Sequence, residues 1–120
     1  MDALSFRLGN RIVGNADGAP ALEMTLNGPT LFFRTDAVIA LTGADMLAKL
    51  DGEVVAHWQT VQVKAGQTLE IGNVTSAGQR CYLAVRHGFD APLYLGSRST
   101  FALGRFGGHA TGALRTGDVL

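Results

Sequence analysis

Short apolar segments separated by turn residues are the feature that most limits how this chain can fold. Such segments, apolar or alternating, occupy residues 22–26, 30–34, 37–41 and 80–86. Turn sequences separate several of them, including Asn27-Gly28-Pro29 and Lys64-Ala65-Gly66-Gln67. Segments this short are typical of strands, and their spacing favours an all-β barrel or sandwich over alternating βαβ units.

Two of these segments carry specific predictions. Residues 37–41 are continuously apolar, which predicts a strand buried on both faces. In residues 80–86, Tyr82 and Ala84 are predicted to lie on one face, and Leu83 and Val85 on the other. Further strands are expected at residues 46–50, 53–56, around Val61 and Val63, around Leu69 and Ile71, and at 113–120. Asp51-Gly52 predicts a two-residue hairpin turn.

Residues 3–13 predict one short amphipathic helix before the strands. Leu4, Leu8 and Ile12 recur every four residues and are expected to form its buried face. Arg7 and Arg11 share another face. Asp2 is a plausible N-cap, and Gly14-Asn15 is a plausible stop. The start of a helix so near residue 1 suggests that the chain is part of something longer.

The composition limits the classes of partner. The chain has 120 residues, 47% of them hydrophobic, which suits one domain with a real core. Its net charge is zero and no basic stripe is present, so a nucleic-acid partner is not expected. No apolar run is long enough to span a membrane, and no signal peptide opens the chain, so we expect a cytoplasmic protein. Charged residues make up only 17%, which fits a surface partly covered by another lobe or subunit.

Cysteine and histidine usage argues against a metal site. Cys81 is the single cysteine, so neither an internal disulfide nor a cysteine-only metal site can form within this chain. Its apolar neighbours favour a buried, inert thiol. The histidines, His57, His87 and His109, have neither the spacing of a zinc pair nor an acidic cluster beside them. We therefore expect no metal in this chain.

Polar groups concentrate near the end of the chain. Ser97, Arg98, Ser99 and Thr100 are followed by Gly107-Gly108-His109. Arginine offers a fork of donors that suits a carboxylate, and histidine can carry a proton near neutral pH. Paired glycines allow a ligand to approach the backbone closely. These residues can converge on a small anionic substrate; the alternative is a helix cap or turn at 97–100.

Two further candidates lie nearer the middle of the chain. Asp45 follows an apolar strand and a glycine, a suitable place for a binding loop. The alternative, favoured by the residues alone, is a turn aspartate bonded to its own backbone. His57-Trp58-Gln59 can line a substrate site, but an aromatic residue there more often closes one end of a barrel.

Several motifs together resemble one family, the carboxyltransferase domain of urea carboxylase (urea amidolyase), which is homologous to the allophanate hydrolase subunit 2 family. They are residues 1–15, Leu22-Glu23 with Gly28-Pro29-Thr30, residues 40–45, 63–67 and 82–86, and residues 95–100 with Phe106-Gly107-Gly108-His109. The resemblance covers nearly the whole chain in order. It departs from the family at Arg105, where a small residue is expected. The family domain is also about twice this length or more, so residues 1–120 are expected to be a single domain that forms one lobe of a larger carboxyltransferase domain.

The resemblance implies a cyclophilin-like β-barrel with a short N-terminal helix, in a mostly β chain. It also implies biotin-dependent transfer of a carboxyl group from carboxybiotin to urea, giving allophanate. Biotin is then carried on another domain, and ATP is used by another domain. The expected partners are biotin carboxylase and biotin carrier domains and a second carboxyltransferase lobe or homologous subunit, and the chain alone is expected to be inactive.

Combined with the chemistry of such a reaction, the matched motifs suggest roles for residues. Arg98, Ser97, Ser99, Thr100 and the Gly107-Gly108 backbone would donate hydrogen bonds to anionic groups. His109 would shuttle a proton, and Asp45 would accept from urea N–H groups. Two alternatives remain open: a subunit of a biotin-free, ATP-dependent 5-oxoprolinase, and a kinase-regulating protein-binding module of the same superfamily.

Overall fold

The computed structural model describes residues 3–19, 21–25, 28, 30–72, 80–87, 93–95 and 101–104. In these ranges one helix, α1 (Ala3–Ile12), precedes a series of strands. The first five strands are β1 (Ala21–Thr25), β2 (Thr30–Phe33), β3 (Ala37–Gly43), β4 (Lys49–Leu50) and β5 (Glu53–Val54). The others are β6 (Val61–Val63), β7 (Thr68–Glu70), β8 (Arg80–Val85), β9 (Leu93–Leu95) and β10 (Phe101–Gly104).

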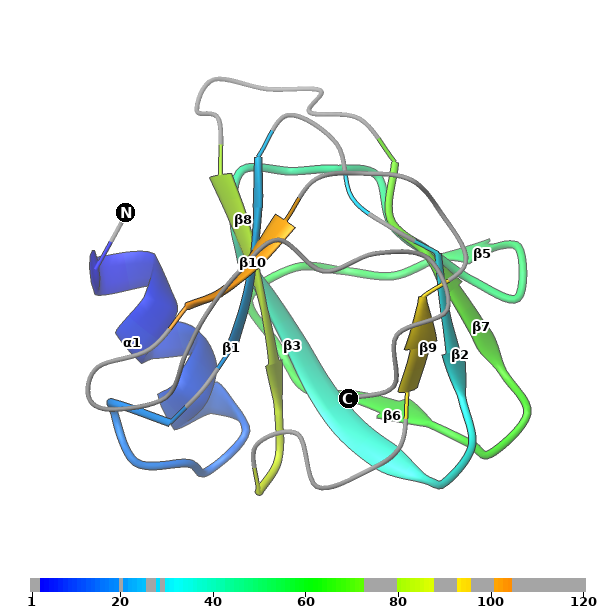
Figure 1. Cartoon of the computed structure of the whole chain (residues 1–120), viewed down its shortest axis with the longest axis horizontal. Helices are drawn as coiled ribbons and strands as arrows, with labels where there is room; N and C mark the ends of the chain where they lie inside the picture. The colour runs from blue at the N-terminus through cyan, green and yellow to red at the C-terminus, as the bar shows by residue number, and fades with distance from the viewer. Residues whose placement is uncertain are drawn as a thin grey trace.

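The strands form two antiparallel sheets (Figure 1). One has the order β10-β1-β8-β3-β6 and the other the order β5-β4-β7-β2-β9. The neighbouring strands in both sheets pair antiparallel. The mostly β fold with one N-terminal helix is therefore as the sequence predicts.

A common apolar core joins the two sheets. Leu22 of β1 pairs with Leu83 of β8, and Leu83 also pairs with Leu41 of β3, so large aliphatic side chains line the inner face of the first sheet. Leu31 of β2 pairs with Leu69 of β7 in the second sheet. All five belong to one buried cluster. The alternation of apolar residues along short strands thus places one face of each sheet against the other.

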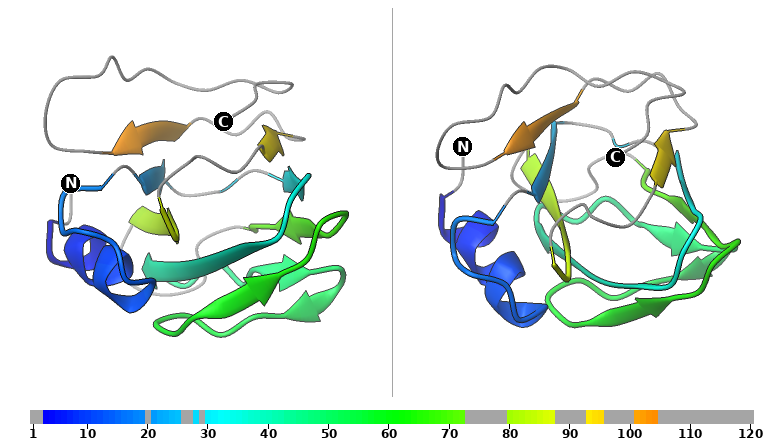
Figure 2. Two further views of the ribbon diagram at one scale, coloured as in Figure 1. Left: turned by 90° about the horizontal axis from the view of Figure 1, so that it is seen from below. Right: turned by 60° about the horizontal axis from the view of Figure 1, so that its bottom comes forward.

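Helix α1 covers the outer face of the first sheet, beside β1, β3 and β8 (Figures 1 and 2). Tyr82 and Ala84 of β8 pack there: Tyr82 meets Phe6, with ring centroids 6.1 Å apart, and Ala84 clusters with Val13 and Ala40. Leu83 and Val85 belong to the inner core. Both predictions, a doubly buried β3 and an alternating β8, are confirmed because α1 supplies the second apolar layer.

The predicted buried face of α1 is only partly right, since Ile12 packs against the cluster of Val13, Ala40 and Ala84 whereas Leu4 faces away from the core. Leu4 is 66% exposed, and the buried helix residues are Ser5, Phe6, Gly9 and Asn10. Close approach to the sheet decides the face: a Cβ on Gly9 would lie 3.0 Å from Thr42 Oγ1. Thr42 Oγ1 in turn donates a 2.7 Å hydrogen bond to the Ser5 carbonyl. Helix α1 therefore contacts the sheet through small and polar residues such as Ser5 and Gly9, and not through Leu4, which the sequence spacing had placed on the buried face.

The turn predicted at Asp51-Gly52 is confirmed, since these residues have φ angles of 49° and 87° and connect β4 to β5. Two positive φ values in succession are typical of the type I′ hairpin turn. Strands β9 and β10 were not anticipated. They pair with β2 and β1 respectively, and so lie at the edges of different sheets. The strand expected at 113–120 and the cap expected at Asp2 lie outside the described residues.

Candidate functional site

Asp45 lies in the loop that follows β3. The strand ends at Gly43, whose φ of +90° turns the chain, and the next amide, Ala44 N–H, donates to the Arg80 carbonyl at 2.8 Å. The Asp45 side chain remains 56% exposed. Its Oδ1 atom accepts a 2.9 Å hydrogen bond from the Leu47 N–H, which is the turn role given by the alternative interpretation of the sequence.

His57 lies beside this carboxylate. The distance from His57 Nδ1 to Asp45 Oδ1 is 3.8 Å, and the His57 side chain is only 10% exposed. Burial lowers the pKa of His57 below its ordinary value, while the negative charge of Asp45 opposes that shift in part. The imidazole is therefore mainly neutral at pH 7, with one nitrogen that donates and one that accepts.

The second nitrogen of His57 has unused hydrogen-bonding capacity. Nε2 is buried and has no hydrogen-bond partner among the residues that the structure describes. Buried polar atoms are nearly always paired, so an unpaired one in a native fold calls for a water or ligand. His57 is thus a polar group whose hydrogen bonding the described part of the chain does not complete.

The two residues line one cleft of about 440 Å³ between the end of β3 and the β4–β5 hairpin. Its lining consists of Gly43, Asp45, Leu47, Val54, Val55, Ala56, His57 and Trp58. Large apolar side chains stand exposed at its rim: Leu47 is 50% exposed, Val54 64% and Trp58 46%. The cleft therefore combines an apolar rim with one carboxylate and one neutral imidazole.

Backbone conformation is unusual at the same place. Leu47 and Trp58 have φ angles of 51° and 64°, a region that residues with bulky side chains rarely adopt. The fold holds them there: Trp58 N–H donates to the Leu41 carbonyl at 2.8 Å, and Leu47 N–H is held by Asp45. Strained residues of this kind cluster at binding sites. The sequence pattern favoured a structural role for Trp58. The feature of the sequence that could have indicated this cleft is the adjacent pair His57-Trp58 downstream of the loop aspartate Asp45.

The other predicted site residues lie outside the described part of the chain. They are Ser97, Arg98, Ser99, Thr100, Gly107, Gly108 and His109. Asp45 is the predicted site residue that the structure places, and the residues that it brings together with Asp45 are His57 and Trp58.

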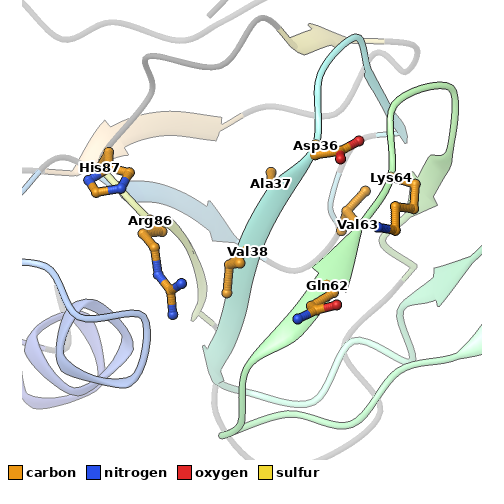
Figure 3. Close-up of a pocket in the computed structure, with 8 residues that line it drawn as sticks. All are labelled: Asp36, Ala37, Val38, Gln62, Val63, Lys64, Arg86 and His87. Carbon is orange, nitrogen blue, oxygen red and sulfur yellow. The ribbon is translucent and has the colours of Figure 1, made fainter.

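A second cleft, of about 310 Å³, lies on the outer face of the first sheet between β8 and β6 (Figure 3). Arg86 and His87 stand on one side of β3, and Gln62 and Lys64 on the other. The Arg86 guanidinium donates a hydrogen bond through Nε to the Val13 carbonyl at 2.9 Å. This bond connects the end of β8 to the residue that follows α1. This cleft contains no residue predicted from the sequence to act in catalysis.

The thiol of Cys81 lies in the apolar core between the two sheets. Cys81 is fully buried in the core, and burial raises the pKa of its thiol to about 12, as expected for an inert cysteine. Within the described ranges, no group of three or more histidine, cysteine, aspartate or glutamate side chains lies close enough together to hold a metal ion. In the same ranges, no helix has the length and hydropathy needed to cross a membrane.

Comparison with known proteins gives one consistent family. The model of the carboxyltransferase domain, subdomain A and B, matches residues 1–120. The urea amidolyase of Saccharomyces cerevisiae is 53% identical over 120 residues, all of this chain and 6% of that protein. A 5-oxoprolinase subunit of Escherichia coli is 42% identical over 120 residues, all of this chain and 38% of that protein.

Solved structures agree. In the crystal structure of the Kluyveromyces lactis urea amidolyase, a region 50% identical to this chain superposes with a TM-score of 0.80. It covers 99% of this chain and 7% of that one. The chain thus spans only a small part of the urea amidolyases that it matches.

Proposed function

Because the chain belongs to the carboxyltransferase domain family, subdomain A and B, we propose that the protein carrying it transfers a carboxyl group from biotin to urea, forming allophanate. One observation carries this choice of substrate: identity is 53% to a urea amidolyase and 42% to a 5-oxoprolinase subunit, each over the whole chain. The difference favours the urea-using branch of the family.

The described residues fit the group that such a reaction requires. Biotin, when bound, supplies the carboxyl group, and its ring presents a ureido N–H and C=O beside an apolar body. The exposed Asp45 carboxylate can accept hydrogen bonds from ureido N–H groups. The apolar rim formed by Leu47, Val54 and Trp58 complements the rest of the ring.

The roles of individual residues follow from this function. Asp45 accepts hydrogen bonds from urea-type N–H groups. Arg98, with Ser97, Ser99 and Thr100, donates to the carboxylate that is transferred, and the backbone of Gly107-Gly108 adds further donors. His109 moves a proton to or from the reacting nitrogen. Each group would act mainly by holding the reactants in place, since fixed orientation removes much of the entropic barrier.

The remaining parts of the reaction lie elsewhere in the protein. This chain spans 6% of the urea amidolyase it resembles, so a biotin carboxylase domain that uses ATP and a biotin carrier domain are proposed outside it. A second carboxyltransferase lobe, in the same protein or in a homologous subunit, completes the site. On this proposal the 120-residue chain binds ligand but does not turn over by itself.

A second function has specific support. The 5-oxoprolinase subunit of Escherichia coli is 42% identical over the whole chain, and the chain covers 38% of that subunit. A biotin-free, ATP-dependent 5-oxoprolinase is therefore the competing candidate. It requires a partner subunit and predicts no dependence on biotin.

The deciding experiment offers urea and 5-oxoproline side by side to the complete protein that carries this chain. Formation of allophanate that requires urea and is abolished by avidin supports the proposal. Turnover of 5-oxoproline that avidin leaves unchanged supports the alternative. Turnover of neither substrate overturns both.

A further inference from the structure

We propose that the cleft between β8 and β6 is a binding site for a small dicarboxylate, a molecule with a carboxylate at each end and an apolar middle. This cleft of about 310 Å³ lies on the outer face of the first sheet (Figure 3). It shares no described lining residue with the cleft that contains Asp45. The inference goes beyond the proposed function and does not depend on which substrate the complete protein uses.

The strand register sets the shape of the cleft. Val38 of β3 pairs with Gln62 of β6. On the other side of Val38, Arg86 directly follows β8, and its N–H donates to the Val38 carbonyl at 2.8 Å. Lys64 lines the same cleft two residues after Gln62. A cationic side chain therefore stands on each side of an apolar floor formed by Ala37 and Val38 (Figure 3).

The charges of the described lining favour an anion. Neither Arg86 nor Lys64 has an ion-pair partner among the residues that the structure describes. Asp36 is the acidic residue of that lining, and its Oδ1 atom accepts a 2.8 Å hydrogen bond from Ala65 N–H, in the loop after β6. This carboxylate therefore helps to hold the loop. The two cationic side chains outnumber it and keep hydrogen-bonding capacity for an anionic ligand.

Hydrogen bonds hold Arg86 in place. Its Nε atom donates to the Val13 carbonyl at 2.9 Å, while its Nη atoms have no hydrogen-bond partner in the described ranges. The Asn15 side chain fastens the backbone on both sides of Arg86: Nδ2 donates to the Val85 carbonyl at 2.7 Å, and Oδ1 accepts from His87 N–H at 2.8 Å. A guanidinium fixed in this way presents two parallel donors, the arrangement that binds a carboxylate through both of its oxygens.

The backbone at His87 also indicates a binding site. Its φ angle is 68°, a conformation that is uncommon for residues other than glycine. The hydrogen bond from its N–H to Asn15 holds it there. Residues kept in such conformations cluster at binding sites, and His87 lines the cleft beside Arg86. Its imidazole offers a further N–H donor at this end of the cleft.

The spacing of the cationic groups selects the ligand. The first sheet has the order β8-β3-β6, so two strand spacings, about 10 Å, separate the strands that carry the two cations. Arg86 and Lys64 stand on opposite sides of that gap, and each charge-assisted hydrogen bond takes up about 2.8 Å. A four-carbon dicarboxylate fits the remaining length, with its methylene groups over Val38. A single oxyanion such as phosphate reaches only one end.

Isothermal titration calorimetry on the complete protein that carries this chain tests the proposal. The probes are succinate, its monoamide succinamate and inorganic phosphate. Succinate should bind about tenfold more tightly than succinamate, since the amide replaces one charged end and weakens one hydrogen bond. Phosphate should bind no more tightly than succinamate. Phosphate or succinamate binding as tight as that of succinate would overturn the assignment of a dicarboxylate.

Lys64→Gln locates the second end of the ligand. It should weaken succinate binding about tenfold and change succinamate binding by less than about twofold, because the carboxylate of succinamate pairs with Arg86. Lys49→Gln is the matched control: the chain has two lysines, both exposed, and Lys49 lies on β4, outside the described lining. Only binding that Lys64→Gln weakens belongs to this cleft. Equal effects of the two lysine variants on succinate binding would overturn the site.

A reversal of charge separates ligand binding from a loss of fold. In Lys64→Glu, 4-aminobutyrate, which has an ammonium group in place of one carboxylate, should bind more tightly than succinate. The wild-type protein should show the opposite order. A misfolded variant would bind neither ligand, so a reversed preference reports a direct contact with residue 64. An unchanged preference for succinate, or no succinate binding to the wild-type protein, would overturn the inference whatever the protein does with urea or 5-oxoproline.

Discussion

The Nδ1 atom of His57 lies 3.8 Å from Oδ1 of Asp45, so a buried imidazole and an exposed carboxylate meet across the base of one cleft. They come from different segments, one directly after β3 and the other after β5. Burial and charge act on the histidine in opposite directions, and burial is the larger effect. The balance between these two effects can be measured.

Asp45→Asn should lower the pKa of His57 further. The negative charge of Asp45 favours the imidazolium form, and its removal leaves burial unopposed. The measurement is an NMR pH titration of the His57 ring protons in the wild-type chain and the variant. Asp36→Asn, remote from His57, is the control and should leave the curve unchanged. A His57 pKa that rises or stays constant in Asp45→Asn would contradict this electrostatic account.

Acidification should destabilise the chain through His57. Its folded pKa lies below the ordinary histidine value of 6.5, so the unfolded state binds the proton more readily. The stability is fully present above pH 6.5 and is lost as pH falls from there through the folded pKa, with a slope of at most about 1.4 kcal/mol per pH unit. Urea unfolding at several pH values gives this slope. The slope should be reduced in His57→Gln, and an unchanged slope would refute the prediction.

Gly43→Ala should destabilise the chain by about 2–4 kcal/mol, since the new Cβ would meet the Arg80 carbonyl oxygen at 2.4 Å in a residue with φ of +90°. Gly52→Ala is the matched control. Its φ is +87°, but nothing lies within 4 Å of a Cβ there, so about 1 kcal/mol is expected. Thermal or denaturant unfolding gives both values. Similar losses at the two positions would show that strain alone, rather than the close contact, limits Gly43.

Cys81 should be unreactive in the folded chain. Its side chain is fully buried, and its thiol pKa of about 12 leaves almost no thiolate near neutral pH. A chromogenic disulfide reagent should therefore modify Cys81 only after unfolding in denaturant. Rapid stoichiometric modification under native conditions would show that β8 opens readily and that this thiol is not held in the core.

Arg98→Ala in the complete protein should lower carboxyl transfer to urea by about 10²–10³-fold, the usual loss when a donor to a developing anion is removed. Arg7→Ala, an exposed helix residue on α1, is the control and should keep wild-type turnover. Steady-state kinetics with urea varied give kcat and KM separately. Full activity of Arg98→Ala would remove Arg98 from the proposed mechanism.

The strands and the core could be predicted because both depend on local sequence. Alternation in β8 and the continuous apolar run in β3 identified which residues face the core, and Asp51-Gly52 identified a turn from two adjacent positions. Strands β9 and β10 were missed because short apolar runs carry little periodicity. Their strand character comes from pairing with β2 and β1, which lie far away in sequence.

The site was only partly predictable. Asp45 was found because a carboxylate after a strand and a glycine is a local pattern. Its partner, His57, was not assigned, since their proximity depends on how the loop after β5 folds back toward the end of β3. The exposure of Trp58 likewise depends on the positive φ that a hydrogen bond to Leu41 holds.

The sequence by itself determined the mostly β class, the two-faced burial of β3 and β8 and the family resemblance, because these follow from residue patterns that need no long-range contact. Tertiary structure decided which face of α1 is buried, where Gly9 allows an approach to Thr42 that the leucine spacing does not reveal. It also decided that Asp45 and His57 share one cleft. Both outcomes depend on distances between segments remote in the chain, and packing of the whole core sets such distances.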